Sequence, residues 1–394
     1  MKVNQLTELV VALYNAQRTG MFWGPPGIGK SASFREAATT IAKSLGLAGP
    51  VLERHQIRPF IKRMDELHGE GQGKLMIKQC FGLFDLRLSQ TDPVEVGGLP
   101  RENKVNGTME KLPPSWFAHT LRDDLPDHGI LLLEELPSAP LSVQTAAYQI
   151  TLDKVIDDYR LKKGWATFAA GNRLTDGGQY FKMPLALANR LCHIDVESDL
   201  DSWSDWAIDN GIDNSLLAFI RFRPELLNTT DEHVKTKAKG FAFGTERQWH
   251  AVDDFLKGNP NAPDWVLSAV CQGLVGPAAI EYVGFRKVWN TMPSIDGIII
   301  DPMTAQVPEE AATQFAVMTA LAARCDYDNA QQCFQYVDRF TQMGRPEMGM
   351  LFVKDMQRRQ GLASQKAQAE GKQFTRAEQS PAYTQWAVKN KDLF

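Results

Sequence analysis

This sequence of 394 residues has few cysteines, no long apolar run and a small net charge. The five cysteines form no Cys-x-x-Cys pair, which argues against a disulfide framework and a cysteine zinc site. The formal net charge of −4 gives no general attraction to nucleic acid or to an anionic membrane. No stretch approaches the roughly 20 apolar residues of a membrane helix, and no secretory leader is evident. We therefore expect a cytoplasmic protein without membrane contact, for which nucleic acid is an unlikely partner.

What the sequence does have is α/β patterning. With 43% hydrophobic residues, a chain of this length can bury one full α/β core and carry a second, smaller domain. Apolar residues at helical spacing predict an amphipathic helix from Leu6 to Tyr14. Further helices are predicted at 32–48 and 141–152, between strands at 21–23, 84–89, 129–133, 165–170 and 191–196. This alternation favours a mostly parallel sheet.

The strand signals fade after residue 199, where helices are predicted at 215–222, 246–256 and 309–323. The apolar triplet at 298–300 is too short to classify. Residues 361–394 are polar and fit either a helix or a partly ordered tail.

Two inserts interrupt the α/β pattern and are predicted to lie at the surface. Residues 54–79 are polar and charged. Residues 97–116 carry turn signals at Gly97-Gly98, Asn106-Gly107 and Pro113-Pro114. Trp116 and Phe117, at the end of the second insert, are candidate contact groups for a pore or a partner, or else buried anchors of the loop.

A glycine-rich segment matches the pattern G-x-x-x-x-G-K-[ST] in full. It comprises Gly24, Pro25, Pro26, Gly27, Ile28, Gly29, Lys30 and Ser31. Glycines let backbone N–H groups wrap phosphates, and the helix that follows turns its positive N-terminus towards them. Lys30 should reach the β- and γ-phosphates of ATP, and Ser31 should bind Mg²⁺.

An acidic pair follows the four apolar residues at 130–133. Glu134 is expected to reach the Mg²⁺ ion through its water shell, and Glu135 to act as general base towards the attacking water. The usual first residue of such a pair is Asp. The extra methylene of Glu134 moves the carboxylate by about one bond length, which a water-mediated Mg²⁺ contact tolerates.

A further predicted strand ends at Asn172. An amide at this point can orient the water between Glu135 and the γ-phosphate, although it could also simply cap a turn.

The order of the segments GPPGIGKS, LLLEEL, AAGNR and PLALANR resembles that of AAA+ ATPases, and specifically of the MoxR branch. The resemblance implies a P-loop AAA+ three-layer domain with a mostly parallel sheet, followed by an α-helical lid and a C-terminal helical extension. The corresponding boundaries are 1–198 for the nucleotide-binding domain, 199–290 for the lid and 291–394 for the extension and tail.

The same resemblance implies a homo-oligomeric ring, usually a hexamer, that hydrolyses ATP to remodel a protein partner. The partner of MoxR relatives typically carries a von Willebrand factor A domain. Arg190 matches the arginine finger that reaches the neighbouring subunit's γ-phosphate, with Arg173 as a rival. Arg247 matches the arginine of the lid that senses the nucleotide.

Two other functions stay open from the sequence. A ring motor on nucleic acid would use the basic residues of the 54–79 insert, although acidic neighbours reduce the positive charge of that insert. A nucleotide-gated scaffold with little turnover is suggested by Glu134 in place of Asp, whereas Glu135 and Asn172 argue against it.

Overall fold

The computed structural model describes residues 1–105, 107–177, 180–236 and 242–391, which form two compact units, Met1–Ser198 and Asp199–Phe394. Asn106 of the predicted Asn106-Gly107 turn lies outside the described residues. Among the residues described, none of the helices combines the length and apolar character needed to cross a membrane.

The first unit is built on a six-stranded sheet in which all neighbouring strands are parallel. Its order is β10-β1-β9-β6-β3-β2. The strands are β1 (Gly20–Trp23), β2 (Val51–Glu53), β3 (Phe81–Arg87), β6 (His128–Glu134), β9 (Gly164–Gly171) and β10 (Cys192–Asp195). The predicted α/β class with a mostly parallel sheet is confirmed. The short edge strand β2 was not predicted.

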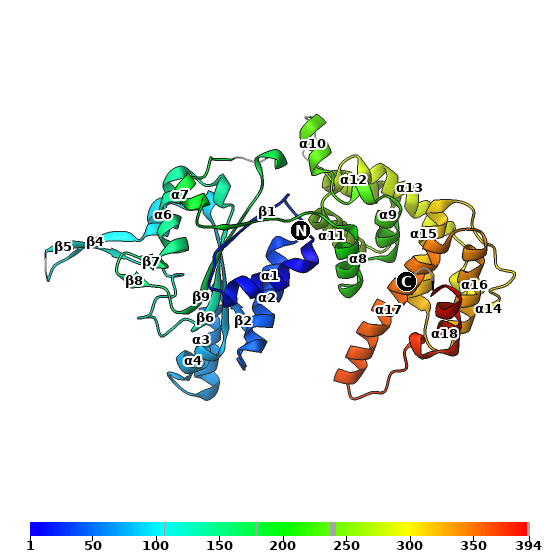
Figure 1. Ribbon diagram of the computed structural model, residues 1–394, viewed down its shortest axis with the longest axis horizontal. Coiled ribbons are helices and arrows are strands. Elements are labelled where there is room, and N and C mark those ends of the chain that lie inside the picture. Colours follow the sequence, from blue (N-terminus) through cyan, green and yellow to red (C-terminus); the bar gives the residue numbers. More distant parts are fainter. Residues whose placement is uncertain (106, 178–179, 237–241, 392–394) are drawn as a thin grey trace. The chain divides into compact units, whose positions relative to one another are not determined.

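Helices cover both faces of this sheet (Figure 1). They are α1 (Leu6–Asn15), α2 (Lys30–Ser44), α3 (Ile57–His68), α4 (Gln72–Met76), α5 (Pro93–Gly97), α6 (Leu141–Leu152) and α7 (Leu185–Ala188). On β6, Ile130 and Leu132 pack in one core with α1 and α2, whereas Leu131 and Leu133 pack in the other with α6 and α7. This period-2 alternation produces the three layers.

Both inserts have regular structure. The insert at 54–79 contains α3 and α4. The second insert forms an antiparallel hairpin, β4 (Leu99–Asn103) with β5 (Thr108–Leu112), which projects from the unit (Figure 1). Another short hairpin, β7 (Val155–Ile156) with β8 (Tyr159–Arg160), precedes β9. Of the two alternatives for Trp116 and Phe117, the buried anchor is confirmed and the contact group is wrong, because the side chains are only 4% and 0% exposed and pack in the core. Burial of two large rings outweighs their exposure on a loop.

His119 fixes the chain that follows these rings. Its imidazole packs edge-on to Tyr159, with ring centroids 4.7 Å apart, and Nδ1 accepts a hydrogen bond from the Leu121 N–H. Burial lowers the pKa of His119, and the cations of Arg122 and Lys162 lower this pKa further, against the opposing effect of Asp124. The folded protein therefore favours the neutral ring.

We predict that stability falls as the pH falls below about 6.5, the usual pKa of an unfolded histidine. With its folded-state pKa lowered, His119 stabilises the fold above that pH, and below it the unfolded chain binds the proton more readily. Urea unfolding at pH 7.5 and 5.5 measures the loss. His119→Asn should have a smaller pH dependence than the wild type, and an equal dependence would contradict this role.

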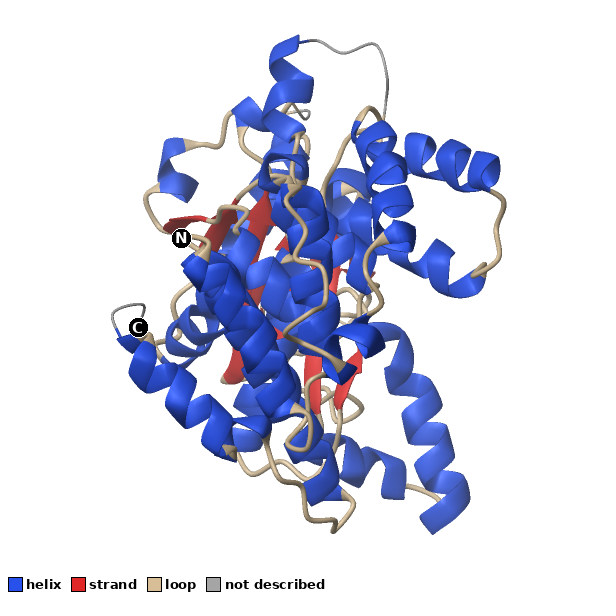
Figure 2. Ribbon diagram, turned by 90° about the vertical axis from the view of Figure 1, so that its right-hand side faces the viewer, coloured by secondary structure: helices blue, strands red, loops and turns tan. Residues whose placement is uncertain are grey.

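The regular elements described in the second unit are all helices (Figures 1 and 2). Its first helices are α8 (Leu200–Asp209), α9 (Asn214–Phe222), α10 (Thr230–Thr236), α11 (Glu246–Gly258), α12 (Asp264–Val275) and α13 (Ala278–Thr291). They are followed by α14 (Ile295–Ile300), α15 (Ala311–Arg324), α16 (Ala330–Gln342), α17 (Pro346–Ala369) and α18 (Pro381–Lys389). The unclassified triplet at 298–300 is thus helical, and much of the C-terminal stretch is helix. The predicted boundary at residue 290 stays a prediction.

A buried ion pair links α9 to α17. Arg221 donates two hydrogen bonds to Asp355, and the side chains are 7% and 1% exposed. Burying two charges is costly, but leaving one buried without its partner costs more.

We predict that Asp355→Asn destabilises the second unit by about 3–5 kcal/mol, because the buried Arg221 charge loses its counter-ion. The matched control is Asp209→Asn on α8, whose pair with Arg358 is about one third exposed and should contribute less than about 1 kcal/mol. Chemical denaturation of both variants measures the difference. An equal loss of unfolding free energy in both variants would show that the buried pair contributes no more than the exposed one.

Candidate functional site

The predicted phosphate-binding loop joins β1 to α2. Gly27 and Gly29 have φ angles of +82° and +91°, which glycine adopts at little cost. Gly24 donates its N–H to the Gly171 carbonyl at 3.2 Å, and a Cβ at Gly24 would lie 2.6 Å from the Val196 carbonyl oxygen. The glycines of the motif are therefore required by the shape of the loop. Because α2 begins at Lys30, the positive N-terminus of this helix lies at the end of the loop.

Lys30 makes contacts within the loop, and Ser31 contacts the end of β6. The Lys30 ammonium donates to the carbonyl oxygens of Gly24 and Pro25 at 2.6 and 2.8 Å. The Ser31 hydroxyl donates to Oε1 of Glu134 at 2.5 Å. The two halves of the predicted site, the loop and the acidic strand end, are thus in direct contact.

The two carboxylates are held differently. Glu134 is the last residue of β6, and its second oxygen, Oε2, lies 3.8 Å from Nε of Arg87 on β3. Glu135 follows in a left-handed conformation, with φ of +58°, and its Oε2 accepts a hydrogen bond from the Ser89 hydroxyl. A non-glycine residue in this region is strained by about 1–3 kcal/mol, and such residues concentrate at functional sites.

Sequence reasoning missed Arg87 and Ser89 as site residues. The available signal was the predicted strand at 84–89, which contains both. Parallel strands end at the same edge of a sheet, so polar residues at the end of that strand belong beside the acidic pair.

Asn172 lies at the same edge. It directly follows β9, which lies between β1 and β6 in the sheet. Gly171 packs so closely on Pro137 that an added Cβ would be 2.3 Å from its Cδ. Strand order therefore brings Asn172 out between the loop and the carboxylates.

The three predicted arginines have no contact with the loop, the two glutamates or Asn172 among the contacts described for them. Arg173 is held within its own unit, by Asp195 at 2.9 Å and the Val196 carbonyl at 3.0 Å. Arg190 is exposed after α7, with its guanidinium 5.1 Å from the ring centroid of Tyr148. Arg247 is exposed on α11 of the second unit.

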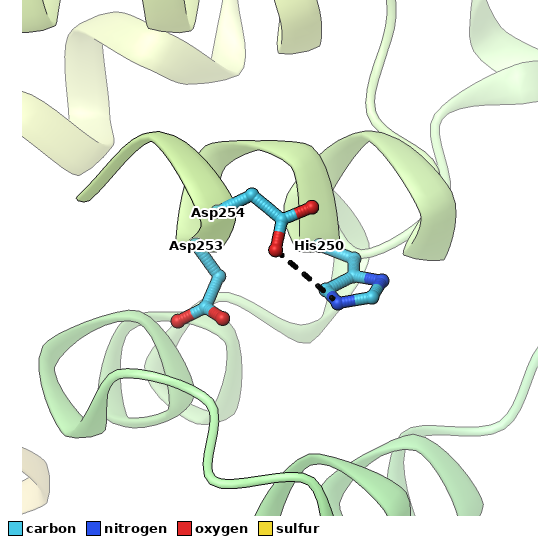
Figure 3. Close-up of side chains that lie close together, drawn as sticks. All are labelled: His250, Asp253 and Asp254. Carbon is cyan, nitrogen blue, oxygen red and sulfur yellow. Dashed lines mark ion pairs between the residues drawn. The ribbon is translucent and has the colours of Figure 1, made fainter. Parts of the chain in front are cut away.

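The second unit brings together a separate group, His250, Asp253 and Asp254, on α11 (Figure 3). His250 lies 3.7 Å from Asp254. The Asp253 carboxylate is already used, since it accepts from the Asp213 N–H at 2.7 Å and pairs with Lys257 at 2.6 Å. Its role here is to fix α11 against the start of α9.

We predict opposite effects of glycine at the two neighbouring glutamates. At position 135, glycine relieves the left-handed strain, so Glu135→Gly should be about 1 kcal/mol more stable than Glu135→Ala. At position 134, in a strand, Glu134→Gly should be less stable than Glu134→Ala by about 0.5–1 kcal/mol. Urea unfolding of the four variants tests this. The same order at both positions would mean that Glu135 is not strained.

Comparisons with known proteins give only remote similarities. No family model and no curated protein matches the chain. Among solved structures, a candidate ATPase from Cytophaga hutchinsonii is 13% identical, with a TM-score of 0.30 over 72% of this chain and 79% of that chain. NtrX from Brucella abortus in complex with ATP is 14% identical, with a TM-score of 0.34 over 86% of this chain and 67% of that chain. AMPPCP-bound DnaA from Aquifex aeolicus is 12% identical, with a TM-score of 0.22 over 90% and 92%.

Proposed function

We propose that this chain is an ATPase of AAA+ architecture that hydrolyses ATP in a homo-oligomeric ring, as a hexamer, to remodel a protein partner. The observation that carries the proposal is the 2.5 Å hydrogen bond from Ser31 to Glu134, which joins the phosphate-binding loop to the acidic strand end. P-loop hydrolases use a hydroxyl of the loop and a carboxylate at a strand end to hold Mg²⁺, and this hydrogen bond places two such groups together. The finer assignment, to the MoxR branch, is supported by the motifs and their order, and a partner with a von Willebrand factor A domain is proposed only as what that resemblance implies.

The residues at this edge fit Mg²⁺ as well as ATP. A serine hydroxyl and a carboxylate are oxygen donors, which Mg²⁺ prefers, and the two lie side by side. Ser31 and Glu134 would hold the ion, directly or through its waters. When bound, Mg²⁺ supplies charge neutralisation at the β- and γ-phosphates.

The remaining residues have distinct tasks in this mechanism. The loop N–H groups and Lys30 bind the phosphates and stabilise their negative charge. Glu135 accepts the proton of the attacking water, and the bond from Ser89 fixes one carboxylate oxygen so that the other faces the reaction. Asn172 orients that water from the neighbouring strand end. Arg247 senses the nucleotide from the helical lid.

Arg190 is proposed to act on the site of the adjacent subunit. Its exposure leaves it accessible to a second copy of the chain, and its cation–π contact with Tyr148 holds it in place. An arginine supplied in this way is worth about 10³–10⁵ in rate. Arg173 is less suited to the task, because Asp195 and a backbone carbonyl already occupy its guanidinium.

We predict that Glu135→Gln and Arg190→Ala each bind ATP but each lose at least about 10²-fold in turnover. Mixed in equal amounts, the two variants should regain about a quarter of wild-type activity, because one interface in four then combines an intact Glu135 with an intact Arg190. Steady-state ATP hydrolysis of the separate and mixed proteins measures this. Glu110→Gln, on the projecting hairpin, is the charge-matched control.

Two outcomes contradict parts of the proposal. Full activity of Glu135→Gln would remove its catalytic role, and failure of the mixture to recover would remove the trans role of Arg190. A wild-type protein that binds ATP and assembles, with or without a protein partner, but does not hydrolyse ATP would favour the scaffold. The nucleic-acid motor is not favoured, because basic residues of the insert lie beside acidic ones, with Lys62 near Glu66 and Lys74 near Asp123. Salt-sensitive DNA binding would revive it.

A further inference from the structure

Arg87 lies next to Glu134 by the register of the sheet. The two residues are Cα partners on the adjacent parallel strands β3 and β6. Their side chains therefore extend from the same face, and Arg87 Nε lies 3.8 Å from Glu134 Oε2. The Arg87 side chain is 59% exposed, whereas that of Glu134 is 16% exposed.

The carboxylate of Glu134 is consequently held from two sides. Ser31, on α2, donates to Oε1, and Arg87, on β3, faces Oε2. Glutamate has one more rotatable bond than aspartate, so its carboxylate samples more positions unless neighbours restrict it. Two contacts from separate elements supply that restriction.

We propose that Arg87 is a positioning residue that holds the long side chain of Glu134 where it meets the Mg²⁺ of a bound nucleotide. This inference rests on the proposed function. It makes Arg87 and Glu134 a matched pair, in which the arginine compensates for the extra methylene of the glutamate.

A purely electrostatic role and a positioning role for Arg87 predict opposite changes in Mg²⁺ affinity when the arginine is removed. A guanidinium beside a metal-binding carboxylate repels a divalent cation, so its removal would strengthen Mg²⁺ binding. If Arg87 instead positions Glu134, its removal weakens Mg²⁺ binding, because the carboxylate must be ordered each time the ion binds. The sign of the change separates the two roles.

We expect Arg87→Ala to raise the Mg²⁺ concentration at the midpoint of the titration by about threefold to fivefold. The measurement is an equilibrium Mg²⁺ titration of a fluorescent ADP analogue on the protein, which requires no hydrolysis. Binding of the analogue in EDTA should be unchanged. Arg101→Ala, which removes the same charge from an ion pair with Glu110 on the hairpin, should leave the midpoint unchanged. An unchanged or lower midpoint for Arg87→Ala overturns the inference.

A double-mutant cycle tests the pairing itself. Glu134→Asp withdraws the carboxylate from Arg87, so in that background Arg87→Ala should shift the midpoint by less than about 1.5-fold. An equal shift in both backgrounds would show that Arg87 does not act through Glu134 and would overturn the inference. If the wild type binds no nucleotide, both the proposed function and the inference about Arg87 fail. If the wild type binds and only the Arg87 result is absent, the inference fails alone.

Discussion

Trp165 sets the register on which the site depends. Gly82 on β3, Gly129 on β6 and Trp165 on β9 are Cα partners across three neighbouring strands. The indole lies against both glycines, since an added Cβ at Gly82 or Gly129 would be 2.5 or 2.7 Å from its ring atoms. It also donates to the Pro126 carbonyl at 3.0 Å. The three strands therefore meet in one arrangement, because any other residue at either glycine would collide with the ring.

Five residues further along each strand, the same alignment produces the edge that carries the proposed site. Arg87, Glu134 and Ala170 are Cα partners there. Ser89, Glu135 and Asn172 lie one or two residues beyond these partners, where the strands have ended. A slip of one residue in any strand would turn its side chains to the opposite face and separate these groups. A packing interaction at the amino ends of the strands thus determines the geometry at their carboxyl ends, where ligands of open α/β sheets bind.

The sequence predicted what local patterns encode. The glycine-rich loop, the acidic pair and Asn172 follow contiguous motifs, and α6 begins and ends where it was predicted. Contacts between strands were missed, because patterns along a chain do not specify register. Ser89 was placed inside a predicted strand, although β3 ends at Arg87 and Ser89 lies in the 3₁₀ turn that follows. The left-handed Glu135 was equally hidden, since no glycine or asparagine marks the turn.

The contacts of Glu134 and Glu135 explain how two adjacent carboxylates can take different roles. Glu134 is met by Ser31 and by the guanidinium of Arg87, so both of its oxygens are constrained. Glu135 is held by a neutral hydroxyl at one oxygen and by a strained backbone. A group that holds a metal needs a fixed position, whereas a general base needs one oxygen able to take up a proton. In the proposed mechanism, the metal-binding carboxylate is therefore distinguished from the catalytic one by its additional contact with the Arg87 guanidinium.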